Sequence, residues 1–216
     1  MADKVTAKNT DAKFKTHDEG QFVAQLMDVI DMGEVVITFP GSPDYLAQKC
    51  VLVFRTGEKN PDNNNEYIDV SSEFTVSMGE KANLRKFLQQ WRGKPYTQEE
   101  ADAGVPLDKL DRQWALLTVA HKTSQKGRTY AIIVSAVGVP KQMRDGLVDY
   151  TNYKRAKFWD EKKAEYAKAT KLYRAEINAP PHGSTQDDMP TDTTDYSEEG
   201  AMDDDQAYSG DDDLPF

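Results

Sequence analysis

The chain has 216 residues, of which 38% are hydrophobic and 30% charged, and its formal net charge is −10. These values are typical of a soluble chain with one domain and appendages, or two small domains. No apolar run reaches the roughly 18 residues that a membrane-spanning helix needs. The N-terminus has no secretory signal, so we expect no membrane partner. Cys50 is the single cysteine, which favours a reducing compartment.

The charges are divided unevenly along the chain. Residues 182–216 hold twelve Asp or Glu and no Lys or Arg, whereas residues 1–181 carry a net charge of +2. Within that part, residues 81–174 hold 20 basic and 10 acidic residues. This asymmetry predicts a basic working surface and an acidic interaction tail.

The first part of the chain reads as an arm followed by strands. Residues 1–19 are polar and lack periodicity, which predicts a flexible N-terminal arm. Strand-like runs follow at 21–29, with a continuation at 34–39 after a bend at Gly33, and then at 45–55 and 67–77.

The period then becomes helical. Leu84, Phe87, Leu88 and Trp91 recur at helical spacing and predict a helix over 81–91. Residues 97–100 read as a capping box. Two more strands are predicted at 113–121 and 128–137, joined by a hairpin loop.

Three strands, a helix and two strands in this order predict a mainly β fold. We expect residues 20–140 to form a five-stranded OB-fold barrel with its helix between strands 3 and 4. Another small β-barrel and an open α+β sheet are the alternatives. Residues 141–181 are expected to be a helical extension with one long helix over 152–178, and residues 182–216 a disordered acidic tail.

A search of the sequence for catalytic groups gives none. The three histidines are isolated from one another, one cysteine cannot build a zinc site, and no phosphate-binding glycine loop is present. The aspartates of the tail have no rigid frame to hold a catalytic metal. We therefore expect a protein that is not an enzyme and has no metal or cofactor.

Basic and aromatic residues are interleaved in two segments, a combination that suits a single-stranded nucleic acid. The first segment holds Arg85, Lys86, Trp91, Arg92, Lys94 and Tyr96, and the second, around the last hairpin, holds Trp114, Lys122, Lys126, Arg128 and Tyr130. Phe54 and Tyr67 are further candidates for base stacking. The competing interpretation places Trp91 in the barrel core and treats Lys122 and Lys126 of the hairpin loop as solvated charges. For Trp114, the sequence favours neither a core position nor a DNA-facing one.

The last six residues resemble a known motif. Asp211-Asp212-Asp213-Leu214-Pro215-Phe216 is similar to the D-D-D-[IL]-P-F tip of bacterial single-stranded-DNA-binding proteins. The resemblance implies that the tip binds replication, recombination and repair enzymes. Phe216 would enter an apolar pocket, its carboxylate would pair with a cation at the rim, and the aspartates would follow a basic groove.

The body resembles a different set of proteins. The segment 84–96 and the segment 116–131 are similar to bacteriophage-encoded proteins predicted to bind single-stranded DNA, which carry L-R-K-F-L-x-x-W-R-G-K-P and H-K-x-S-x-K-G-[KR]-x-Y-A. This resemblance covers roughly residues 30–140 and implies a role in the cytoplasm of a bacterial host.

The sequence therefore predicts a protein that coats single-stranded DNA with little sequence preference and recruits enzymes through its tip. A decoy that captures host enzymes without binding DNA, and an RNA-binding OB protein, are the alternatives. A homodimer formed through the 152–178 helix is possible alongside a monomer.

Overall fold

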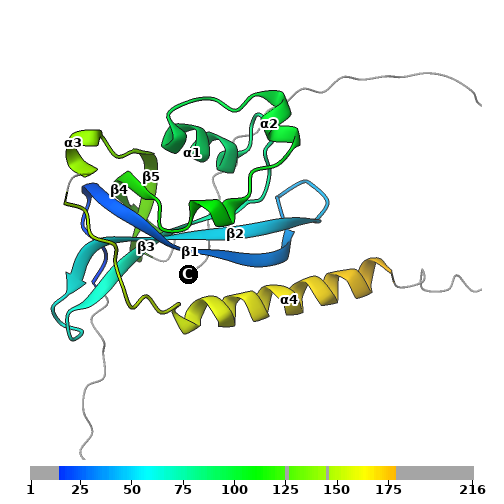
Figure 1. The fold of residues 1–216 in the computed structure, drawn as a ribbon. Coiled ribbons are helices and arrows are strands. Elements are labelled where there is room, and N and C mark those ends of the chain that lie inside the picture. The colour runs from blue at the N-terminus through cyan, green and yellow to red at the C-terminus, as the bar shows by residue number, and fades with distance from the viewer. Residues whose placement is uncertain (1–14, 125–126, 145, 179–216) are drawn as a thin grey trace, which may run out of the picture.

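The protein is mainly β. The computed structural model describes residues 15–124, 127–144 and 146–178, and their strands form one antiparallel sheet in the order β3-β2-β1-β4-β5 (Figure 1). The strands are β1 (Gly20–Ile37), β2 (Tyr45–Asn60), β3 (Glu66–Thr75), β4 (Trp114–Thr123) and β5 (Thr129–Gly138). The five predicted strands and their order along the chain are confirmed.

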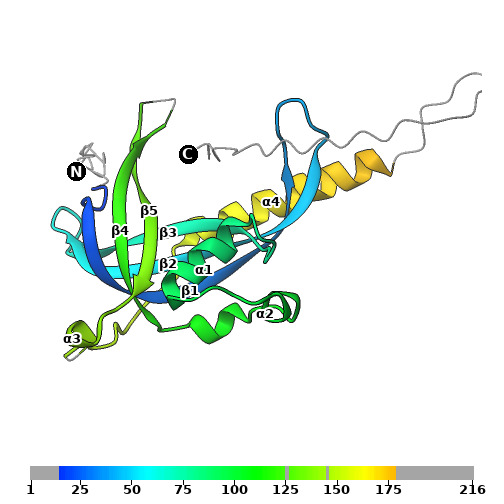
Figure 2. The same cartoon turned by 90° about the horizontal axis from the view of Figure 1, so that it is seen from above.

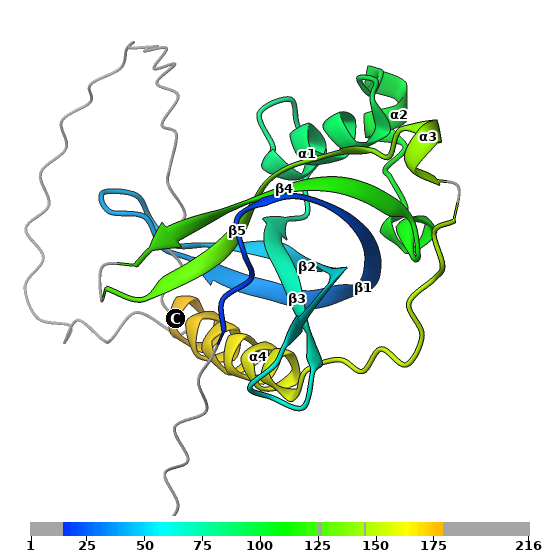
Figure 3. The same ribbon diagram turned by 90° about the vertical axis from the view of Figure 1, so that its left-hand side faces the viewer.

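The sheet is strongly curved because its central strand is long and irregular. The first residues of β1 pair with β4 and the rest pair with β2, with register shifts at Leu26/Asp28 and Asp31/Gly33. Bulges of this kind increase the bend and twist of a strand, and Gly33 accommodates a positive φ of 79° at the second one. The sheet coils so that β3 and β5, its two edges, come into contact (Figure 3).

Helices lie on both sides of the sheet (Figure 1). On one side are α1 (Asn83–Arg92), α2 (Gln98–Asp102) and a 3-10 turn (Leu107–Leu110), and on the other is α4 (Lys157–Ile177). The short α3 (Lys141–Arg144) follows β5. The predicted capping box is present, with Thr97 accepting from the Glu100 amide and Glu100 from the Thr97 amide. No helix among the described residues combines the length and apolarity needed to cross a membrane.

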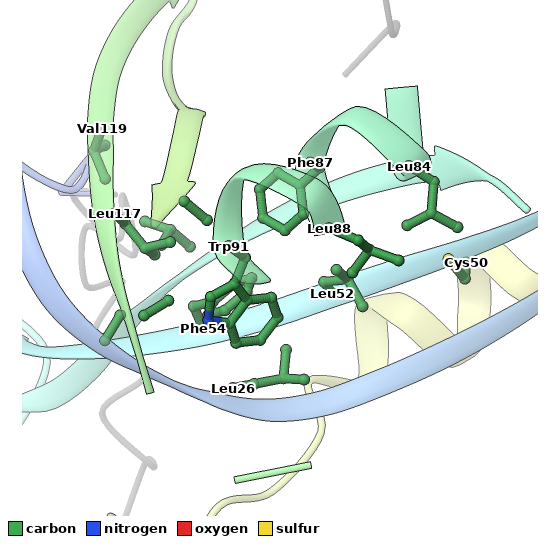
Figure 4. Packing of buried hydrophobic residues seen from close by; sticks show 14 residues of the cluster. Leu26, Cys50, Leu52, Phe54, Leu84, Phe87, Leu88, Trp91, Leu117 and Val119 are labelled. Carbon is green, nitrogen blue, oxygen red and sulfur yellow. The ribbon is translucent and has the colours of Figure 1, made fainter. Parts of the chain in front are cut away.

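The main core lies between the curved sheet and α1. Phe54 of β2 packs edge-on against Trp91 of α1 with ring centroids 5.4 Å apart, and Leu26 and Leu117 fill the space beside them (Figure 4). The predicted helix over 81–91 buries its apolar face here, as its spacing indicates.

A second core lies on the opposite face of β1 and β2. Ile30, Met32, Val51 and Val53 are buried there under Tyr153, Trp159 and Tyr166 of the C-terminal extension. The apolar run at 50–54 is therefore buried on both faces. The long helix begins at Lys157, later than the predicted 152, because the preceding residues form an irregular segment that bonds to the sheet, with Asn152 at a positive φ of 58°. Gln25 accepts from the Tyr150 amide, and Arg155 forms two hydrogen bonds to Asp28.

Residues 15–19, predicted to belong to a flexible arm, pack on the sheet. His17 is 1% exposed, and its ring lies 2.6 Å from the Thr56 hydroxyl and 3.1 Å from the Glu58 carboxylate. Lys15 donates to the same carboxylate across 2.7 Å. The prediction of a flexible arm does not hold for these five residues, because partners on β2, β4 and β5 bind them. Residues 1–14 lie outside the described part of the chain.

Candidate nucleic-acid interface

Two hairpins project on the same side of the molecule, with β3 running between them. They are the β1–β2 hairpin and the β4–β5 hairpin (Figure 2). Two hollows border β3, one lined by its residues 68–71 and the other by residues 73–75. We call these the β5-side hollow and the α1-side hollow, and the two together the β3 channel.

The β5-side hollow contains predicted binding residues. It has a volume of about 560 Å³, and Arg128 and Tyr130 of the β4–β5 hairpin face Ile68–Ser71 of β3 across it. Lys15 and Thr16 form its third wall. Lys122 is the cross-strand partner of Tyr130, so the register brings three predicted residues together on this hairpin. Lys126 lies outside the described residues.

The α1-side hollow has the same combination of a ring and a cation. It has a volume of about 700 Å³ and is lined by Tyr45, Lys81 and the residues that lead into α1. The Tyr45 side chain is 47% exposed and stacks on Phe39, with ring centroids 6.3 Å apart and 24° between planes. A stacked, exposed aromatic pair on a hairpin is suited to receive a base.

The two carboxylates of β3 that line the channel, Asp69 and Glu73, are neutralised by internal partners. Arg55 donates two hydrogen bonds to Asp69, at 2.7 and 2.8 Å. Glu73 accepts from Lys49 and Lys162, both at 2.9 Å. Burial of Glu73 opposes its ionisation, but the two lysines outweigh this effect and hold the pKa of its carboxyl below the usual value. The floor of the channel therefore carries little net negative charge, although Glu80 lies at the rim.

This arrangement is suited to a flexible polyanion with aromatic groups. Cations at Lys15, Arg128 and Lys81 lie near both ends of β3, each close to an exposed or half-buried ring. From residue 68 to residue 75 the strand spans ~23 Å, from its rise of about 3.3 Å per residue. That length accommodates a few nucleotides, within the site sizes of about 4–16 nucleotides that OB folds show.

Three predicted binding residues are structural instead. Phe54 is 0% exposed and Trp91 is 7% exposed, so neither ring has a face available for a base. Arg85 is buried as well, and its guanidinium donates to the carbonyls of Met78 and Tyr96. The prediction was wrong for these residues because they share the apolar face of α1 or the inner face of β2.

Five other predicted residues lie away from the channel. Trp114, Arg92 and Tyr96 line a smaller hollow of about 330 Å³ with Lys109 and Arg144, and Lys94 is exposed beyond the end of α1. Arg92 forms two hydrogen bonds to Glu100 and lies over the Tyr96 ring. Trp114 and Lys122 are separated by the length of β4, ~26 Å at about 3.3 Å per residue. Lys86 is exposed on α1.

Tyr67 belongs to a cluster at the start of β3. Arg55 lies 4.3 Å and Lys59 4.8 Å from its ring centroid, and Tyr150 contacts it edge-on at 5.6 Å. Tyr150 also contacts Trp114, at 5.7 Å. The structure thus connects two predicted stacking residues through Tyr150, but it places them under the C-terminal extension and outside the β3 channel.

The sequence reasoning missed three residues of the channel, which are Lys15, Tyr45 and Lys81, and it also missed Phe39, which stacks on Tyr45. Phe39 and Tyr45 flank the turn at 40–43, and this position was a usable signal, because an OB barrel uses its first hairpin as well as its last as a groove wall. Lys15 and Lys81 carry no such signal, because only long-range packing brings them to β3.

Comparison with known proteins assigns no family. The chain matches no protein-family model and no curated protein sequence. Among the described residues, no group of three or more His, Cys, Asp or Glu side chains is placed to hold a metal ion.

Proposed function

We propose that this protein binds single-stranded DNA along the β3 channel with little sequence preference. The observation that carries the proposal is the pairing of a ring with a cation in each hollow, Tyr130 with Arg128 and Tyr45 with Lys81. Bases stack on such rings irrespective of their identity, whereas cations follow the phosphates.

We also infer that the sheet is a barrel of the OB type. Its support is the helix between the third and fourth strands, the pairing of β1 with both β2 and β4, and the contact between β3 and β5. In such a barrel, the first and last hairpins form the two walls of the ligand groove, which is where the β3 channel lies.

The recruitment of partners remains a proposal from the sequence. The tip at 211–216 lies outside the described residues. Its acidic and apolar side chains are suited to a pocket with a cationic rim on replication, recombination or repair enzymes. From the resemblance of the body to phage proteins, we propose that this activity takes place in the cytoplasm of a bacterial host. A homodimer through α4 is less favoured, because α4 already packs on its own sheet.

The test is a salt-titrated binding measurement with the full chain. Labelled oligo-dT, a matched double-stranded DNA and a matched single-stranded RNA are titrated at several salt concentrations by fluorescence anisotropy. We expect the tightest binding to oligo-dT, with a logarithmic salt slope of about −0.7 for each phosphate neutralised on a single strand. Binding that persists only for RNA would favour the RNA-binding alternative. No uptake of any oligonucleotide at low salt would refute the proposal and favour the decoy.

A further inference from the structure

The C-terminal helix α4 contacts both the floor and one wall of the α1-side hollow. We propose that α4 is a functional part of the DNA site, in which Lys162 cancels the charge of Glu73 and Tyr173 positions the β1–β2 hairpin. This inference rests on the proposed function, and it assigns roles to residues outside the segments of the sequence that suggested DNA binding.

The first step concerns the charge of the floor. Glu73 lines the α1-side hollow, and its side chain is 4% exposed. One of its carboxylate oxygens accepts from Lys49 on the neighbouring strand, the other accepts from Lys162 of α4, and the Tyr166 hydroxyl lies 3.3 Å from both. Lys162 is held in place between the Trp159 and Tyr166 rings, at 5.5 and 5.3 Å from their centroids.

Loss of Lys162 would leave Lys49 as the single lysine bonded to the Glu73 carboxylate and would lower the net charge of this group of side chains by one unit. An anion with low exposure acts through a medium of low effective dielectric, so its repulsion of a phosphate is much less screened than that of an exposed carboxylate. Lys162 therefore favours DNA without touching it, and its effect should disappear when the carboxylate is removed.

The second step concerns the position of the wall. The Tyr173 hydroxyl donates to the Asp44 carbonyl across 2.5 Å, immediately before Tyr45. Thr170 donates to the Glu34 carbonyl across 2.7 Å, and Arg174 pairs with the Glu34 carboxylate. These contacts lie on β1 and on the residue immediately before β2, near the end of the β1–β2 hairpin. They hold the stacked pair of Phe39 and Tyr45 at a fixed place beside β3.

The charge step is tested with a cycle of variants of the full chain. Lys162→Met should weaken oligo-dT binding by several-fold to about tenfold at low salt, from the loss of one positive charge at close range. Glu73→Gln should bind at least as well as the wild type. The double variant should bind within about twofold of Glu73→Gln, because the lysine then has no carboxylate to cancel.

Lys168→Met is the matched control, since it removes the same charge from the exposed face of the same helix. It should change affinity by less than about twofold, as expected for a screened surface charge. Equal losses for Lys162→Met and Lys168→Met, or a loss that Glu73→Gln does not restore, would overturn the charge step.

The wall step has a readout that needs no DNA. Tyr173→Phe removes only the hydroxyl that bonds to the Asp44 carbonyl. We expect faster amide hydrogen exchange over 38–46, with exchange in β4 unchanged, and weaker oligo-dT binding. Leu172→Ala, at a neighbouring exposed position, should change neither. Unchanged exchange in Tyr173→Phe would exclude this role. If the wild type binds no oligonucleotide, the proposed function fails, and the exchange result still decides whether α4 positions the hairpin.

Discussion

The indole N–H of Trp91 donates a hydrogen bond to the carbonyl of Trp114 across 3.0 Å, which joins α1 to the first residue of β4. Trp91 also packs against Phe54 and Phe87 in the core. This contact makes Trp91 a structural residue. Trp91→Phe should lower the free energy of unfolding by ~1–3 kcal/mol, from one hydrogen bond and a small cavity. Urea unfolding measures this loss. The affinity of the folded variant for oligo-dT should stay within about twofold of the wild-type value. A larger change in affinity would show that Trp91 contributes to DNA binding.

Two residues of the β4–β5 hairpin should have different effects on DNA binding. Tyr130→Ala should cost about 1–3 kcal/mol of binding free energy with little change in salt dependence, because it removes a stacking ring. Arg128→Ala should reduce the salt slope by about one phosphate contact. Phe158→Ala, which removes an exposed ring on α4, is the control and should leave the affinity for oligo-dT unchanged. If Phe158→Ala and Tyr130→Ala weaken binding equally, the Tyr130 ring contributes no more to DNA binding than a ring outside the channel.

The thiol of Cys50 should be unreactive in the folded protein. Burial, with smaller contributions from Asp31 and Glu73, raises its pKa to about 11, so very little thiolate exists at pH 8. A chromogenic disulfide reagent should modify Cys50 slowly at pH 8 and rapidly once urea unfolds the chain. Rapid modification of the folded protein would show that the thiol is accessible.

The Glu73 carboxyl should contribute to stability at neutral pH. Its folded pKa lies below the usual value of 4.5, so the contribution is complete above about pH 4.5 and is lost as pH falls through the folded pKa. Urea unfolding between pH 7 and pH 3 should show a smaller acid-dependent loss for Glu73→Gln than for the wild type. An identical pH dependence would mean that other carboxyls account for the acid sensitivity.

Gly57 is required for the contact of β2 with the C-terminal extension. It has a φ of +89°, and a Cβ there would lie 2.6 Å from the Tyr150 hydroxyl. Gly57→Ala should therefore destabilise the protein by ~1–3 kcal/mol through backbone strain and displacement of Tyr150. Gly104 has a similar φ of +77° and open space around it, so Gly104→Ala measures the loss of stability caused by backbone strain alone. Equal melting temperatures for the two variants would indicate that Tyr150 moves aside freely.

The order of strands and helices could be predicted from the sequence because each element has its own signal. The period of two at 113–121, the period of 3.6 at 81–91 and the capping box at Thr97 all correspond to elements of the structure. These signals are local, and they depend on the face that each element buries rather than on what covers it.

The binding residues could be predicted only in part. A strand that is buried on both faces lacks the alternation of apolar and polar residues that would distinguish a binding face from a core face. Val51 and Val53 are buried by α4, and Leu52 and Phe54 by α1, so the run at 50–54 has no exposed face for periodicity to reveal. Arg85 looks like a binding cation in sequence, and only the tertiary structure shows that two backbone carbonyls hold it. Arg128 and Tyr130 were predicted to lie in the groove because their hairpin position alone brings them there.

The C-terminal end of α4 lies near one of the two hairpins that border the β3 channel and far from the other. Asn178 closes the helix a few residues beyond Tyr173, which is bonded to the β1–β2 hairpin, whereas the β4–β5 hairpin stands at the opposite end of β3. The chain that leads to the proposed tip therefore starts nearer the hairpin of Tyr45 than that of Tyr130. Because a DNA strand has distinct 5′ and 3′ ends, a fixed orientation in the channel would present the same end of the strand to every enzyme delivered in this way.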